Sequence, residues 1–226
     1  MLIPKVEHPD SLRLYRPISL CPDIYKTITK IVANKLKGIL PELIGPMQTS
    51  FVPGRHITEN IIIAQEVIHT MRQKSGKIGH MLIKVDLEKA YDRLSWDFIF
   101  ETLCEAGIPS DLIRITMDCI TSASMQILWN GECTEEFVHS QGIRQGGPIS
   151  PYIFVLCIER LSHGIHRAIN IGTWRPIQLS KRGTPITHVF FVDDLLLFAE
   201  ASCTQAAVIN DVLNTFYVSS GAKVKK

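Results

Sequence analysis

The sequence predicts an α+β fold in which helices pack against an antiparallel sheet. Apolar residues recur at helical spacing between residues 22 and 43. A second observation is an apolar strand at 81–86 that ends in an acidic residue. The third is the segment 188–199, where Asp193 and Asp194 interrupt an apolar run that is typical of a hairpin of two buried strands. If these strands are neighbours, they form the antiparallel sheet that the helices cover.

The composition is that of a folded protein with one sizeable domain or two small ones. The chain has 226 residues, of which 46% are hydrophobic and 20% are charged. Its apolar runs are shorter than the roughly 20 residues that span a bilayer, and its first residues lack the apolar core of a signal peptide. The cysteines are far apart and form no C-x-x-C pair, which favours reduced thiols and an intracellular setting. We therefore expect no membrane partner.

Basic residues are concentrated in the first third of the chain. Residues 1–80 hold 11 Lys and Arg against 6 Asp and Glu, whereas residues 81–226 hold 13 against 16. This division is compatible with a phosphate-contacting part followed by a metal-holding part. A chance imbalance on a solvated surface is the alternative.

The first third is expected to begin extended and then to become helical. Prolines discourage a helix in residues 1–20. A helix follows from 22 to 43 and stops at Gly45-Pro46. We expect a loop at 48–56, a second helix at 58–73 and a turn at 76–79.

The strand at 81–86 is followed by helices and one hairpin. Ser95 is placed to cap a helix that runs to Ala106, and the sequence Gly107-Ile-Pro109 breaks that helix. Asn130-Gly131 is typical of a hairpin turn. We expect further helices at 110–121, 150–169 and 203–218, hairpin strands at 125–130 and 134–139, and a Gly/Pro-rich loop at 142–151.

Asp193, Asp194 and Asp86 form the candidate chemical centre. Burying even one unpaired carboxylate is costly, so two at the tip of an apolar hairpin need a cation or must titrate. If the strand that ends at Asp86 lies beside the hairpin, three carboxylates converge, which is the ligand set of a two-metal site for phosphoryl or nucleotidyl transfer. Hard divalent ions such as Mg²⁺ suit these oxygen ligands. An exposed Asp-Asp turn is the alternative.

Three segments resemble motifs A, B and C of reverse transcriptases in order and spacing. They are 84–93 (KVDLEKAYDR) followed by Trp96, then 142–151 (GIRQGGPISP), then 191–194 (FVDD). Two others, 15–21 (YRPISLC) and 51–55 (FVPGR), resemble more narrowly the non-LTR (LINE-type) retrotransposon branch, especially its plant members. The resemblance extends from Leu2 to Val224 and implies a right-hand polymerase fold. It places residues 1–80 in the fingers and residues 81–226 in the palm, whose antiparallel sheet is backed by helices.

The resemblance implies roles for the acidic residues and for one aromatic residue. Asp86, Asp193 and Asp194 would be the catalytic, metal-binding carboxylates, with the Leu87 carbonyl as a further ligand. The cofactor would be a pair of Mg²⁺ ions, with Mn²⁺ as a substitute. Tyr91 matches the steric gate, because a bulky ring crowds a 2′-hydroxyl and so favours deoxynucleotides. A tyrosine packed in the core is the alternative.

A second group of residues matches the floor of the nucleotide site. Gln145 and Gly146 match the motif B loop, where a glycine lets the backbone come close to a ligand. Arg144 beside them would face phosphate or template. An ordinary glycine-rich helix entry is the alternative. Asp92 recurs in the family motif without an evident metal role, and we assign it to local hydrogen bonding.

Three basic residues match nucleic-acid or triphosphate contacts. Lys5 and Arg16 match basic fingers positions that reach the triphosphate or the template. Arg55, in the Pro-Gly-Arg loop, would touch the template backbone. A solvated surface charge is the alternative for each of them.

The sequence departs from the family pattern at three places. Gly147 stands where the family usually has Asp, a loss that would cost a loop or cap hydrogen bond worth about 0.5–2 kcal/mol. Val192 replaces the commoner Ala, and Lys225 stands in place of Asn.

By resemblance the chain is an RNA-directed DNA polymerase domain that extends a DNA primer on an RNA template with deoxynucleoside triphosphates (dNTPs). The alternative is an inactive retrotransposon remnant that at most binds nucleic acid. An RNA-templated RNA polymerase or a maturase-like protein shares the palm, but the Tyr91 gate and the flanking motifs count against the RNA polymerase. The resemblance also implies that a thumb, an endonuclease and other parts of a parent polyprotein lie outside this chain. Because such elements are copied at chromosomal DNA, it implies a nuclear location.

Overall fold

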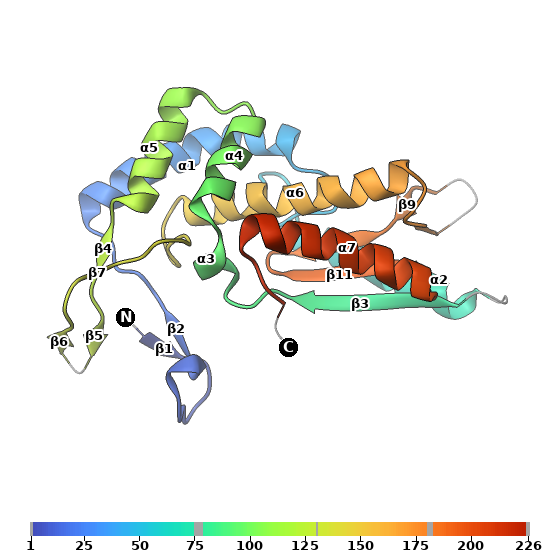
Figure 1. The fold of residues 1–226 in the computed structure, drawn as a ribbon, viewed down its shortest axis with the longest axis horizontal. Coiled ribbons are helices and arrows are strands. Elements are labelled where there is room, and N and C mark those ends of the chain that lie inside the picture. The colour runs from blue at the N-terminus through green and yellow to red at the C-terminus, as the bar shows by residue number, and fades with distance from the viewer. Residues whose placement is uncertain (1, 75–78, 130, 180–182, 225–226) are drawn as a thin grey trace.

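A three-stranded antiparallel sheet lies at the centre of the molecule, as the sequence predicts (Figure 1). The computed structural model describes residues 2–74, 79–129, 131–179 and 183–224. The strands β10 (His188–Phe191), β11 (Asp194–Glu200) and β3 (His80–Asp86) lie in the order β10-β11-β3. β10 and β11 form a hairpin, and every residue of β11 pairs with β3, so that Asp194 lies opposite Asp86.

Seven α-helices pack around this sheet in the described part of the chain. They are α1 (Asp23–Leu43), α2 (Ile57–Gln73), α3 (Ala90–Arg93), α4 (Trp96–Glu105), α5 (Ser110–Thr121), α6 (Ser150–Asn170) and α7 (Cys203–Ser220). α6 is the most deeply buried, and each residue from Ile153 to Ile158 is at most 4% exposed. This stretch of α6 is apolar on every side, which is typical of a helical segment inside a core. None of these described helices is both long and apolar enough to cross a bilayer.

Helices cover both faces of the sheet, because apolar side chains alternate along its strands. On β11, Leu195 and Leu197 point into a core that is shared with α6 and α7. Phe198 packs on the opposite face in a smaller cluster with Val67 of α2. The sheet is therefore a middle layer, with α7 in front of it in the view of Figure 1.

The two edges of the sheet differ. The outer edge of β10 is covered, because the Phe190 N–H donates to the Met47 carbonyl (2.9 Å) and the Asn60 side chain donates to the Phe190 carbonyl (2.8 Å). Among the described residues, no strand pairs with the outer edge of β3. The sheet is thus closed on the side of α2 and open along β3.

The main core crosses the predicted boundary at residue 80. Val32 and Leu36 of α1 belong to the same apolar cluster as Phe154 of α6, and α1 contacts both α5 and α6. The division into fingers (1–80) and palm (81–226) stays a prediction.

Short paired strands lie outside the central sheet. The pairs are β1 (Leu2–Pro4) with β2 (Tyr15–Pro17), β4 (Ser124–Met125) with β7 (Phe137–Val138), β5 (Leu128–Trp129) with β6 (Glu132–Cys133), and β8 (Ile177–Gln178) with β9 (Pro185–Ile186). In Figure 1, β1 with β2, β4 with β7, and β5 with β6 lie below the helices on the left-hand side. A single 3-10 turn, Leu12–Leu14, precedes β2.

The predicted helices and central strands are confirmed to within a few residues, and the differences are local. Ser95 precedes α4, but its side chain makes no cap hydrogen bond. The hairpin expected at 125–139 is divided into two ladders, and Thr134 Oγ1 accepts from the Ile127 N–H between them (2.9 Å). α3, β8 and β9 were not predicted. The turn at 76–79, except Gly79, and Asn130 lie outside the described residues.

Candidate catalytic site

The Asp193-Asp194 pair lies at the connection between β10 and β11. Phe191 pairs with Asp194, so Val192 and Asp193 form a two-residue turn at the end of the sheet. Val192 has a φ of 60°, and the left-handed region costs a residue with a Cβ roughly 1–2 kcal/mol. Strain of this kind persists only where the surrounding structure imposes it, and it clusters at functional sites. A two-residue hairpin turn requires such a φ, so the strain at Val192 accompanies the turn that presents Asp193.

Asp86 joins the pair through the strand register, which places it opposite Asp194. Residues directly opposite each other in an antiparallel pair have Cβ atoms about 4.5–5.5 Å apart, and like charges there repel. Burial raises the pKa of the Asp193 carboxyl, and the charges of Asp194 and Asp86 raise it further, whereas Arg16 lowers it. The carboxylates that the sequence predicts to converge are thus electrostatically coupled.

Lys84 pairs with one of these carboxylates. Its Nζ lies 3.2 Å from Oδ1 of Asp194, and the two side chains are 60% and 44% exposed. An ion pair this exposed contributes about 0–1 kcal/mol. Within the described residues, no three side chains of Asp, Glu, His or Cys are arranged to hold a metal ion. The donor set still fits a hard divalent cation, because that ion prefers carboxylate oxygens, but in this conformation Asp194 faces a lysine.

Leu87, the predicted backbone ligand, directly follows β3. Its side chain is buried, and its backbone forms an isolated antiparallel bridge with Val224. The next N–H, of Glu88, donates to the Lys223 carbonyl (2.8 Å). The segment after α7 therefore runs beside the residues that follow Asp86 and holds them in place. The role of the Leu87 carbonyl as a metal ligand stays a prediction.

Tyr91 lies on α3 and is supported from behind by α6. Its ring stacks on that of Phe154, with ring centroids 4.6 Å apart and planes 11° apart. Phe154 is fully buried, so the support is rigid. Burial raises the pKa of the Tyr91 hydroxyl to about 12, and the charge of Asp193 also raises it, which indicates that the phenol is near the acidic turn. The position is compatible with the predicted steric gate, which stays a prediction.

Hydrogen bonds hold the loop around Gln145, which is predicted to lie beneath the nucleotide, on two sides. Gln145 donates from Nε2 to Oδ1 of Asp92 (3.0 Å), and its own carbonyl accepts from the Ser19 N–H (3.0 Å). Gly146 has a φ of 93°, a conformation that glycine adopts at little cost. The local hydrogen bonding expected of Asp92 is observed. The contacts of Gln145 and Gly146 with a nucleotide stay predictions.

Gly147 lies in a space that is already filled. A Cβ at this position would lie 2.8 Å from Oγ of Ser150, a residue in the first turn of α6. No side chain caps the start of α6 at Ile149, and the cost of a glycine at position 147 stays a prediction. The serine would have to rotate before an aspartate fitted here.

Arg144 is engaged with α1. Its guanidinium carbon lies 4.3 Å from the centroid of the Tyr25 ring, and Nη1 is 3.9 Å from Sγ of Cys21. A cation over an aromatic face gains about 0.5–2 kcal/mol. The predicted contact of Arg144 with phosphate or template would compete with this packing and has no support in the geometry.

Arg16 and Lys5 lie on or beside the β1–β2 pair. Arg16 is exposed and close enough to the acidic turn to lower the pKa of Asp193. The backbone N–H of Lys5 donates to the Leu14 carbonyl (2.7 Å), and its side chain is exposed. The structure therefore brings Arg16 toward the predicted catalytic carboxylates. Contacts of either residue with triphosphate or template stay predictions.

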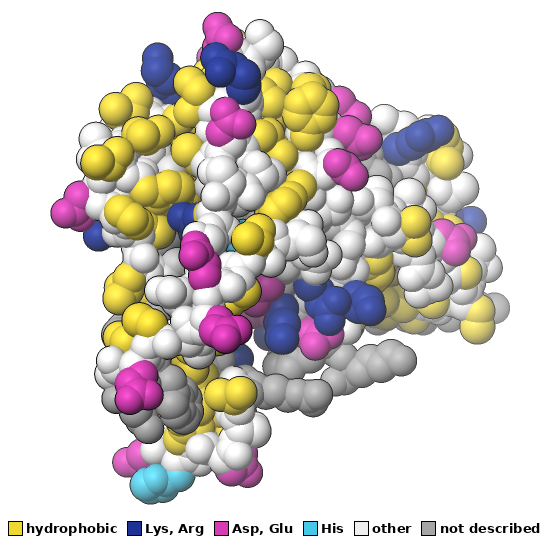
Figure 2. All heavy atoms as spheres, turned by 60° about the vertical axis from the view of Figure 1, so that its left-hand side comes forward, with side chains coloured by type: hydrophobic (Ala, Val, Ile, Leu, Met, Phe, Trp, Pro, Cys, Tyr) yellow, Lys and Arg dark blue, Asp and Glu magenta, His cyan; other side chains and the backbone are white. Residues whose placement is uncertain are grey.

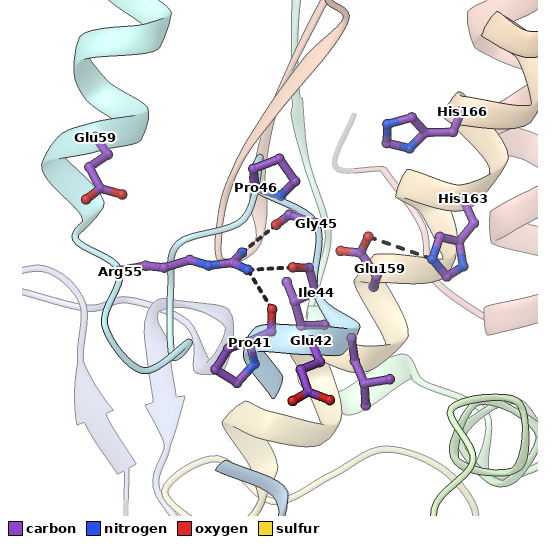
Figure 3. Close-up of a pocket in the computed structure, with 11 residues that line it drawn as sticks. Pro41, Glu42, Ile44, Gly45, Pro46, Arg55, Glu59, Glu159, His163 and His166 are labelled. Atoms are coloured by element: carbon purple, nitrogen blue, oxygen red, sulfur yellow. Dashed lines mark hydrogen bonds and ion pairs between the residues drawn. The ribbon is translucent and has the colours of Figure 1, made fainter. Parts of the chain in front are cut away.

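Arg55 has a structural role that the sequence analysis did not anticipate. Its guanidinium donates to four carbonyls in the last turn of α1 and just after it, at distances of 2.5–3.2 Å. Figure 3 shows the bonds to Pro41, Ile44 and Gly45. The last carbonyls of a helix have no partner within the helix, and an arginine can satisfy them. Because four of its five N–H donors are occupied, a template contact by Arg55 stays an unsupported prediction. The four acceptors belong to Pro41, Ile44, Gly45 and Gln48.

A cavity of about 600 Å³ lies beside Arg55, and none of the predicted catalytic or nucleotide-binding residues lines it. Glu159 of α6 is 6% exposed there, with Oε1 3.8 Å from Nε2 of His163 (Figure 3). Burial raises the pKa of Glu159 to about 7, against hydrogen bonds from Gly45 and Ser162 and the charge of Arg55. Because protein groups surround this carboxyl, we interpret the cavity as part of the scaffold.

Three important contacts were not predicted from the sequence, and one of them is made by Trp96, which the motif A resemblance already names. Lys84 pairs with Asp194, Phe154 supports Tyr91, and Trp96 Nε1 donates to the Gly142 carbonyl (2.9 Å). Alternation along β3 places Lys84 on the same face as Asp86, and this signal was available in the sequence. No local pattern indicates the other two partners, because they are distant in the chain.

The fold and the acidic turn define a class. The hairpin carries two adjacent carboxylates beside a strand that ends in a third, and helices cover both faces of the sheet. This arrangement fits the class of template-directed polymerases. The sequence profile of the family described as "Reverse transcriptase (RNA-dependent DNA polymerase)" matches residues 3–226, and the chain belongs to this family.

Relatives of the chain include retrotransposon proteins, which confirms the predicted resemblance. The Pol polyprotein of the type-2 retrotransposable element R2DM of Drosophila melanogaster is 26% identical over 215 residues, covering 95% of this chain and 19% of that protein. A 149 kDa protein of transposon TX1 from Xenopus laevis is 29% identical over 158 residues, covering 70% of the chain and 12% of that protein. The chain therefore spans less than a fifth of each of these two relatives.

Solved telomerases share the fold. The structure of telomerase from Candida tropicalis, in complex with a fragment of telomeric RNA, superposes with a TM-score of 0.61 at 14% identity. The match covers 88% of this chain and 32% of the telomerase chain. At this identity the similarity shows the right-hand polymerase fold.

Proposed function

We propose that the chain is the polymerase portion of a retrotransposon reverse transcriptase, which extends a DNA primer on an RNA template with dNTPs. The observation that carries the proposal is the register that places Asp86 opposite Asp194, with Asp193 in the adjoining turn. In a member of the reverse transcriptase family, this arrangement supports nucleotidyl transfer.

Asp86, Asp193 and Asp194 would hold two Mg²⁺ ions, or Mn²⁺ in their place. When bound, such ions lower the pKa of an attacking hydroxyl and neutralise the charge of a leaving pyrophosphate. The residues of the chain would position the substrates and select deoxynucleotides over ribonucleotides. The Tyr91 ring, stacked on Phe154, would stand where a ribose 2′-hydroxyl would otherwise fit.

The proposed partners are RNA template, DNA primer and dNTPs, and the proposed location is the nucleus. Figure 2 shows a group of Lys and Arg side chains beside Asp and Glu side chains near the middle of one face. Adjacent basic and acidic groups suit a surface that binds a phosphate backbone next to metal-holding carboxylates.

The experiment is primer extension on poly(rA)/oligo(dT) with dTTP and either Mg²⁺ or Mn²⁺. We expect extension by the unaltered chain, and a loss on the order of a thousandfold in Asp193→Asn, because several kcal/mol of metal-assisted stabilisation disappear. Asp97→Asn, an exposed change on α4, is the matched control. Equal extension by Asp193→Asn would exclude this turn as the source of the activity.

The second candidate is a chain that binds nucleic acid without turnover. It is favoured by one observation, that the described residues contain no ready-made group of metal ligands. Template binding by a folded chain, together with no extension and no calorimetric signal from Mg²⁺ or Mn²⁺, would favour this candidate.

A further inference from the structure

The helix α3 and the loop 142–146 are joined by a set of contacts centred on Asp92. We propose that Asp92 is a positioning residue, which fixes the orientation of the Gln145 amide so that its oxygen is presented as a hydrogen-bond acceptor. This inference rests on the proposed function, because the hydrogen-bond donor to the amide oxygen would be a group of the incoming nucleotide.

The chemistry of the pair determines the orientation. An ionised carboxylate only accepts hydrogen bonds, whereas an amide has one face that donates and one that accepts. Since Oδ1 of Asp92 lies 3.0 Å from the Gln145 side chain, the NH₂ group must face the carboxylate. The Oε1 atom then faces the opposite direction. An asparagine at position 92 could either donate or accept, and would leave the amide of Gln145 without a fixed direction.

The backbone holds the two partners in register. The Gly142 N–H donates to the Leu94 carbonyl (2.7 Å), and the Ile143 N–H donates to the Tyr91 carbonyl (2.8 Å). Gly142 has a φ of 88°, and a Cβ there would lie 2.6 Å from the Asp92 carbonyl oxygen. Only glycine allows so close an approach. The separation of Asp92 and Gln145 is therefore set by main-chain contacts on both sides of the pair.

The same short helix also carries the candidate gate. Asp92 directly follows Tyr91, whose ring is fixed against Phe154. The Gln145 carbonyl is bonded in addition to Ser19, before α1. A change in the orientation of Gln145 would therefore alter the floor of the site while Tyr91 keeps its support. This arrangement predicts an effect on nucleotide affinity that is separable from the chemical step.

The test is a double-mutant comparison by steady-state kinetics of dTTP incorporation on poly(rA)/oligo(dT). In Asp92→Asn we expect KM for dTTP to rise about tenfold, with kcat nearly unchanged. This is the lower end of the effect of losing a hydrogen bond to a charged group, because asparagine can still accept one hydrogen bond. Gln145→Glu should be worse, because two carboxylates then face each other. The double variant Asp92→Asn with Gln145→Glu should recover much of that loss, since an amide at 92 can donate to a carboxylate at 145. Asp97→Asn is the control.

Two results would overturn the inference: an unchanged KM in Asp92→Asn, or a double variant no better than Gln145→Glu alone. Urea unfolding of each variant shows whether the fold is kept. An unaltered chain that extends no primer would instead remove the proposed function. The interaction of Asp92 with Gln145 would then be tested by a double-mutant cycle, in which the unfolding free energies of the two single variants and the double variant give the coupling energy. Zero coupling overturns the inference, and a measurable coupling supports the pair.

Discussion

Two acidic regions of the molecule hold their carboxyl groups in opposite ways. At the end of the sheet, Asp193 lies near Asp194 and Asp86. Burial raises the pKa of Asp193, and the charges of the other two carboxylates raise it further. In the cavity beside α1, Glu159 has no other carboxylate among the groups that shift its pKa, and Gly45 and Ser162 donate to it. Like charges that repel each other in the free chain suit a cation supplied from outside. A carboxyl surrounded by donors is part of the scaffold.

The largest effect is expected in the turn at the end of the sheet, where one substitution should remove activity without lowering stability. Asp193→Asn should lose activity on the order of a thousandfold while the unfolding free energy at pH 7 stays equal or rises. The reason is that the native state already disfavours the charged form of this residue. Urea denaturation at pH 7 measures the unfolding free energy of the variant and of the unaltered chain. A clear loss of stability in this variant would show that the turn is structural rather than catalytic.

Arg55→Leu should show the reverse behaviour. Its guanidinium satisfies four carbonyls at the end of α1, so its removal should cost about 2–4 kcal/mol of unfolding free energy. The activity of the folded fraction should be unchanged. Arg72→Leu, an exposed change on α2, is the control. If the salt dependence of template binding falls by about one unit of slope in Arg55→Leu, the arginine contacts nucleic acid after all.

Glu159→Gln should change the pH dependence of stability. The pKa of Glu159 is raised from 4.5 to about 7 in the folded chain, so the native state binds more protons than the unfolded state between these values. Its contribution to stability is present below pH 4.5 and is lost as the pH rises through 7. At about 1.4 kcal/mol for each pKa unit, the loss is of the order of 3 kcal/mol.

Thermal or urea unfolding between pH 4 and 8 measures this effect as the difference between the unaltered chain and Glu159→Gln. The exposed Glu101→Gln change on α4 is the control. His188, whose pKa is lowered to about 3 by burial, has the opposite sign, because its contribution is lost as the pH falls below 6.5. Only the difference curve isolates Glu159. A flat difference curve would contradict the assignment.

The smallest expected effect concerns Lys84. Its exposed ion pair with Asp194 is worth about 0–1 kcal/mol, so Lys84→Met should scarcely change stability. Removing the cation that faces Asp194 should raise the affinity for Mg²⁺ a few-fold, which calorimetry measures. A weaker affinity would indicate that the lysine helps to arrange the carboxylates for the ion.

Most of the fold follows from local patterns in the sequence. Apolar residues at helical spacing predict α1 to within a residue, and the two apolar runs around Asp193 predict β10 and β11. The elements that were missed are short. α3 has four residues and β8 has two, and such elements are fixed by tertiary contacts rather than by periodicity.

The site residues show the same difference between what local patterns predict and what only tertiary contacts determine. The convergence of Asp86 with Asp194 follows from strand order, which the motif sequence suggested. The positions of Arg55 and Arg144 did not follow, because a basic residue in a loop carries no local signal that tells a helix end from a phosphate. Their partners, the carbonyls after α1 and the Tyr25 ring, are determined only when the chain is folded.

The open edge of β3 has a consequence for handling the protein. Seven residues, His80–Asp86, present one row of backbone donors and acceptors that no described strand covers. Such a row is a template for pairing with another copy of the same strand. Lys84 and Asp86 are the Lys and Asp side chains of this strand, and a charge such as that of Lys84 opposes edge-to-edge pairing. The kinetic and calorimetric samples should therefore be prepared dilute, and light scattering should accompany each Lys84 variant.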